Sequence, residues 1–69
     1  MTAPPDEALT TLLNFVNRSH ITGILEQAEV IERKDRAFLR FSRKVAQLAE
    51  NFEFDRISTL VRLLRGDIR

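Results

Sequence analysis

Residues 35–52 read DRAFLRFSRKVAQLAENF, and this stretch decides the fold. Its apolar residues recur every three or four positions, which is the period of one face of an α-helix. They are Phe38, Phe41, Val45, Leu48 and Phe52. Asp35 is suited to cap the start of this helix, because its side chain can accept hydrogen bonds from the free N–H groups of the first turn. The stretch therefore predicts a helix over 36–51 with one buried side.

Three further segments show the same period, and no run of strand length alternates between apolar and polar residues. They predict helices over 6–18, 20–33 and 53–65. Acidic residues directly after Pro4 and Pro5 suit a first helical turn, and Gly66 is suited to end the last helix. Short connections, of about two to five residues, imply that consecutive helices lie antiparallel. The predicted fold class is all-α, a compact antiparallel four-helix bundle built from two similar helical hairpins.

A single domain over residues 6–66 follows, with 1–5 as a leader or linker and 67–69 as a C-terminal tail. The predicted core contains Leu12, Val16, Ile24, Ala28, Phe38, Phe41, Val45, Leu48, Phe52, Ile57 and Val61. A weak internal repeat supports the two hairpins, because a shift of 33 residues places Leu12 on Val45 and Ile24 on Ile57. Two repeats are too few for a solenoid, which needs about three, so two hairpins closing on each other are favoured.

The composition is that of a small soluble domain, with 69 residues, 43% hydrophobic and 30% charged. The chain has no cysteine, so it forms neither a disulfide framework nor a thiolate metal site, and it fits a reducing cytoplasm. No signal peptide and no membrane span are expected. Because so short a chain offers little core, a homodimer is favoured over a monomer. Phe15, Val30 and Leu63 lie off or at the edge of the apolar stripes, and we expect them to form an apolar patch for dimerisation or for a partner.

Few residues of this sequence are candidates for catalysis. His20 is the only histidine, and four-helix bundles include phosphotransfer domains that use one. However, His20 falls at the predicted junction of the first two helices, where its ring can pack or cap. The glutamates Glu26, Glu29 and Glu32 are spaced for a solvated helix side and not for a closed ligand set. We therefore expect no enzyme activity, no metal and no cofactor.

The stretch RKDRAFLRFSRK, residues 33–44, concentrates six basic residues in a chain of net charge +1. At 100° per residue its basic side chains lie opposite the phenylalanine stripe, and some meet at the i,i+4 spacing where like charges repel. The predicted partner-binding residues are Arg33, Arg36, Arg40, Arg43 and Lys44. Helix folding alone would not select this pattern, so we expect docking of an acidic protein partner. A solvated surface and a nucleic-acid site are the alternatives, but the low net charge argues against nucleic acid.

The positive charge is also unevenly distributed along the chain. Residues 1–32 hold five acidic residues and one basic residue, a net charge of −4, whereas residues 33–69 hold ten basic and five acidic residues, a net charge of +5. The acids of the second helix could offset part of the repulsion through Glu29–Arg33 and Glu32–Arg36 pairs, if that helix continues far enough.

The order of these features resembles the helical segment at the C-terminal end of some bacterial hybrid sensor histidine kinases, after their receiver domains. The matching features are Leu9 and Leu12, Gly23-Ile24, Glu26 through Glu32, Asp35, Phe38 and Phe41, Leu48-Ala49, and Phe52 with Ile57. The resemblance covers roughly residues 8–65. It implies a non-catalytic accessory module for interaction or signal transmission in a two-component system. His20 departs from that pattern, which usually has an aspartate or asparagine at this turn.

Overall fold

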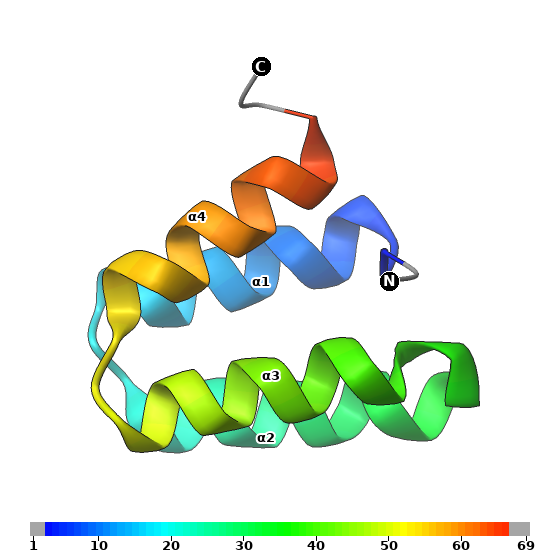
Figure 1. Ribbon diagram of the computed structural model, residues 1–69, viewed down its shortest axis with the longest axis horizontal. Coiled ribbons are helices and arrows are strands. Elements are labelled where there is room, and N and C mark those ends of the chain that lie inside the picture. Colours follow the sequence, from blue (N-terminus) through cyan, green and yellow to red (C-terminus); the bar gives the residue numbers. More distant parts are fainter. Residues whose placement is uncertain (1–2, 67–69) are drawn as a thin grey trace.

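The computed structural model describes residues 3–66, and within this range it contains helices and no strand (Figure 1). Its elements are α1 (Asp6–Asn17), α2 (Ile21–Lys34), the 3-10 helix η1 (Arg36–Phe38), α3 (Leu39–Glu50) and α4 (Phe54–Arg65). The predicted all-α fold with four helices is therefore confirmed. The third helix differs from its prediction, because it begins with η1 and becomes α-helical only at Leu39. The predicted tail over 67–69 lies outside the described residues.

The four helices alternate in direction and form a closed ring of neighbours (Figure 1). Helix α1 packs against α2 and α4, and α3 packs against the same two helices, so that α1 and α3 are diagonal to each other, as are α2 and α4. Helix α4 begins beside the end of α3 and rises away from it toward its own C-terminal end (Figure 1). The distance between these two helices therefore widens along α4.

The 33-residue repeat appears in the structure as two equivalent helix ends. After α1, the His20 N–H donates to the Phe15 carbonyl at 2.9 Å and Ser19 has φ 53. After α3, the Glu53 N–H donates to the Leu48 carbonyl at 2.9 Å and Phe52 has φ 59. Both are Schellman closures, in which one left-handed residue lets the chain reverse while the last helical carbonyls stay bonded. The two hairpins thus share their turn geometry.

One face of each helix contributes to a single core. The largest fully buried side chain of this core is Phe41. The buried apolar residues are Ala8, Leu9, Leu12, Val16, Ile24, Ala28, Ile31, Phe41, Val45, Leu48, Ala49, Ile57 and Val61. Nine of the eleven predicted core residues are in this set. Phe38 is only partly buried and packs against the edge of the core.

Phe52 was expected in the core, and that prediction is wrong. Its side chain is 67% exposed. Helix α3 ends at Glu50, and the left-handed conformation at Phe52 turns the side chain away from the stripe that Leu48 follows. The ring instead meets Phe54 edge-on, with 6.4 Å between the ring centroids. Its periodic position predicted burial only for a helix that continued through it.

The boundary between the predicted leader and the domain lies inside the described residues. Pro5 precedes α1, and its carbonyl accepts from the Leu9 N–H at 3.1 Å. Pro4 is buried, so the end of the predicted leader packs on the domain. Asp6 and Glu7 occupy the first turn of α1, where their charges interact favourably with the free N–H groups.

Candidate functional site

The five predicted partner-binding residues lie on three consecutive elements. Arg33 is in the last turn of α2, Arg36 is in η1, and Arg40, Arg43 and Lys44 are on α3. All five are exposed. We call these five residues the basic face. It is therefore not a face of one helix, as the sequence suggested, but extends from the end of α2 over η1 onto α3.

The break between α2 and α3 decides which charges are paired. The predicted Glu29–Arg33 pair is confirmed, with Arg33 Nη2 donating to Glu29 Oε1 at 2.6 Å. The predicted Glu32–Arg36 pair is not formed. It required the helix to continue, whereas α2 ends at Lys34 and Asp35 is extended, with φ −160 and ψ 135.

Asp35 caps η1 and does not extend α2. Its carboxylate oxygen Oδ1 accepts from the Ala37 N–H at 2.9 Å. The predicted capping role of Asp35 is thus correct, but the capped turn is η1 and not the α-helix itself. An aspartate suits this position because its short side chain can return to a backbone N–H two residues later.

Two surface depressions on either side of α3 divide the basic face. The first lies over α2, η1 and α3, has a volume of about 430 Å³ and is lined by Glu29, Glu32, Arg33, Arg36, Leu39 and Arg43. The acids of α2 therefore lie beside Arg36 and Arg43, and they offset part of the basic charge on that side. This neighbourhood follows from the packing of α2 against α3.

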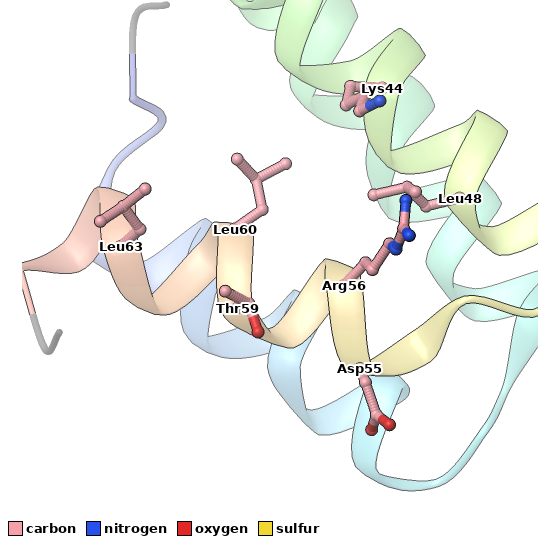
Figure 2. A pocket seen from close by; sticks show the side chains of 7 residues that line it. All are labelled: Lys44, Leu48, Asp55, Arg56, Thr59, Leu60 and Leu63. Atoms are coloured by element: carbon pink, nitrogen blue, oxygen red, sulfur yellow. The ribbon is translucent and has the colours of Figure 1, made fainter.

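The second depression, which we call the α3/α4 groove, has a volume of about 350 Å³. Its lining residues are Lys44 and Leu48 from α3 and Asp55, Arg56, Thr59, Leu60 and Leu63 from α4 (Figure 2). Leu48 is buried, Leu60 is partly buried and Leu63 is 56% exposed, so the leucines rise from the floor of the groove to its edge.

Arg40 and Lys44 carry the charge that is least compensated. They are one helical turn apart on α3, where two positive side chains repel each other. Among the described residues, neither side chain has an ion pair. The spacing places Arg40 on the ridge between Arg43 and Lys44. The part of the basic face nearest the α3/α4 groove is therefore the part that an external acidic group would stabilise most.

His20 has a structural role at the start of α2. Its Nδ1 accepts from the Gly23 N–H at 2.7 Å, and its ring lies 5.5 Å from the ring of Phe15 between centroids. The expectation that this ring packs or caps at the helix junction is confirmed. His20 is the N-cap residue of α2, whereas a phosphotransfer histidine would need to stand exposed in the middle of a helix.

The three residues of the predicted apolar patch, Phe15, Val30 and Leu63, do not lie together. Phe15 is partly buried and lies against the backbone of Gly23. Val30, 45% exposed, is on α2 and Leu63 is on α4, two helices that are diagonal in the bundle. Leu63 belongs to the α3/α4 groove, whereas Phe15 and Val30 do not line it.

Sequence reasoning missed the partners of Leu63 in this groove. Leu60 and Arg56 were not proposed as site residues, and Leu48 was assigned to the core alone. The sequence contained a signal, because the apolar residues of α4 together cover about half of the helix circumference, which is wider than the stripe that one core needs, and Leu63 lies at one end of that arc.

Within residues 3–66, no three histidine, cysteine or acidic side chains are grouped so that they could hold a metal ion. In the same range, no helix has the length and apolar character needed to cross a membrane. Ser42 is buried, and its hydroxyl has no hydrogen-bond partner among the described groups.

Comparison with family models, with curated proteins and with solved structures found no match to this chain.

Proposed function

We propose that this protein is a non-catalytic interaction module that docks an acidic protein partner through its basic face. The observation that supports this most directly is that all five basic side chains are exposed. Among residues 3–66, only one of the five forms an ion pair, Arg33 with Glu29. An acidic partner would relieve the repulsion between Arg40 and Lys44, and it would be attracted over a distance of roughly 10 Å at moderate salt.

The resemblance to the C-terminal segments of hybrid sensor kinases makes a signalling partner the natural candidate. In that setting the module would work in the cytoplasm of a bacterium as an accessory part of a two-component system. It would supply a docking surface and leave the phosphoryl chemistry to other domains. A homodimer also belongs to the proposal, because a 69-residue chain has only a small core.

The test reverses charge on the ridge of α3. An Arg40→Glu/Arg43→Glu variant should keep the helical circular dichroism of the parent, since both side chains are exposed. Its capture of the partner should be weaker, mainly because association is slower, and the difference should shrink as salt is added. The matched control is Arg18→Glu/Arg62→Glu, which changes the net charge equally at exposed positions away from the basic face.

Equal capture by the parent, the variant and the control would refute the docking role. Binding of random oligonucleotides by the parent, with an affinity that falls steeply with salt, would assign the basic face to nucleic acid instead. Light scattering at two protein concentrations tests self-association separately, and a constant monomeric mass would remove the homodimer from the proposal.

A further inference from the structure

The α3/α4 groove combines an apolar floor with a basic edge. Leu60 and Leu63 project from α4, and Leu48 from α3, toward the space between the two helices (Figure 2). Lys44 lines the groove on the α3 side, and Arg40 lies one turn before it on the same helix. This combination of apolar and charged groups is more specific than the basic face alone, because a purely acidic ligand would leave the leucines exposed.

The spacing of the groove residues matches the repeat of a helix. On α4 the lining residues Arg56, Leu60 and Leu63 follow an i, i+4, i+7 pattern, which covers about 10 Å along the helix axis. A second helix laid along such a row presents its own apolar residues at the same intervals. Residues 3–66 offer no strand edge, so an extended peptide has no backbone partner there.

The charges around the groove determine which residues suit the flanks of a bound helix. Lys44 has no ion pair among the described residues, and Arg56 has only an exposed contact with Glu53, with 3.4 Å between Nε and Oε1. Asp55 is the single acidic residue of the lining. Exposed pairs such as Arg56–Glu53 contribute little, so Arg56 is free to exchange Glu53 for an acid on a ligand.

We propose that the α3/α4 groove binds an amphipathic helix of a partner protein, with an apolar stripe packed on Leu48, Leu60 and Leu63 and with acidic residues facing Lys44 and Arg56. This inference rests on the proposed docking function and specifies the partner's contact element. Because Leu63 is exposed and Leu60 is only partly buried, the added helix covers these side chains without displacing the core.

The experiment uses three designed helical peptides and the full chain. The first peptide carries leucines at i, i+4 and i+7 with glutamate flanks, the second has the same leucines with lysine flanks, and the third has the glutamates but serines in place of the leucines. Fluorescence polarisation measures affinity, and NMR titration of labelled protein locates the contact. The first peptide should bind at least tenfold more tightly than the other two, and its shifts should centre on Leu60 and Leu63.

Substitutions at exposed positions then separate the groove from its surroundings. Leu63→Glu should weaken binding of the first peptide at least tenfold, while Val30→Glu, which adds the same charge at an exposed apolar position of α2, should leave it unchanged. Lys44→Glu should shift the preference toward the lysine-flanked peptide. Circular dichroism of each variant confirms that the helices remain.

Three results would overturn the groove proposal. One is a failure of the first peptide to bind at millimolar concentration, and another is equal affinity of the parent and the Leu63→Glu variant. The third is equal binding of the first and third peptides with loss of both in Arg40→Glu/Arg43→Glu. That last result removes the groove but keeps the acidic-partner function, so the two proposals fail in distinguishable ways.

Discussion

A single added methyl group at Gly23 tests how α1 and α2 meet. A Cβ atom at this position would lie 2.5 Å from Phe15 Cδ1, 2.7 Å from Phe15 Cε1 and 2.8 Å from His20 Nδ1. Carbon atoms in ordinary contact are about 3.5–4.0 Å apart. In Gly23→Ala the Phe15 ring would therefore have to move by about 1 Å, and the capping bond from Gly23 to His20 would be disturbed.

The expected change in stability is the sum of opposing contributions. Alanine is favoured over glycine within a helix by about 1 kcal/mol. Overpacking costs about 1–3 kcal/mol, and a damaged N-cap costs about 1 kcal/mol more. Gly23→Ala should therefore lower the free energy of unfolding by about 1–3 kcal/mol, although the same exchange stabilises most helices. For a domain of this size, each 1 kcal/mol corresponds to a fall in Tm of about 4–8 °C.

A double-mutant cycle with Phe15→Ala identifies the cause. Without the ring the added methyl group has room, so Gly23→Ala should cost little in that background or stabilise it. Urea denaturation of the four proteins gives the coupling free energy between the two positions, which should exceed about 1 kcal/mol. Stabilisation of the parent by Gly23→Ala, or additive effects of the two substitutions, would refute the close contact between Phe15 and Gly23.

Three further predictions concern the core, the cap and the buried hydroxyl. Phe41→Ala should lower the free energy of unfolding by about 3–5 kcal/mol in urea denaturation, because Phe41 is fully buried. Phe52→Gly should melt at or above the parent temperature, because it removes a phenylalanine from a left-handed backbone position. Equal losses of stability in the two variants would contradict these environments. His20→Ala should lower the free energy of unfolding by about 1 kcal/mol, and His20→Asp should recover most of this loss because aspartate also caps a helix. Equal melting temperatures of the two variants would show that the loss does not come from the cap. Ser42→Ala should raise the free energy of unfolding by about 1–2 kcal/mol because it removes a buried hydroxyl without a partner; a loss of stability would show that the hydroxyl is bonded.

Local pattern was sufficient to predict most of the fold. The three-to-four residue period of the apolar side chains identified all four helices and placed Phe41, Val45 and Ile57 in the core. The 33-residue repeat indicated two equivalent hairpins, and the turns after α1 and α3 do share one geometry. The apolar period depends on neighbours within one or two turns, so the buried side of each helix can be predicted from the sequence, whereas the residue at which each turn closes cannot.

The candidate site was predicted only as a set of residues and not as an arrangement. The five members of the basic face are exposed as expected, but the break at Asp35 distributes them over three elements. The Glu29–Arg33 pair is formed because both residues lie within α2. The Glu32–Arg36 pair is not formed because Glu32 lies in α2 and Arg36 lies in η1, after the helix has ended. A spacing rule for charges holds only while the helix is continuous.

Two features were decided by tertiary structure alone. Phe52 continues the apolar period of α3, yet the Schellman closure before α4 gives it a left-handed backbone and turns it to the solvent. Helix α4 diverges from α3 (Figure 1), and Leu60 and Leu63, which line the α3/α4 groove, are less covered than the leucines of the core. The physical reason is the same for both features. Periodicity states which side of a helix is apolar, but where the helix ends and how closely its neighbour approaches depend on packing between segments distant in the chain.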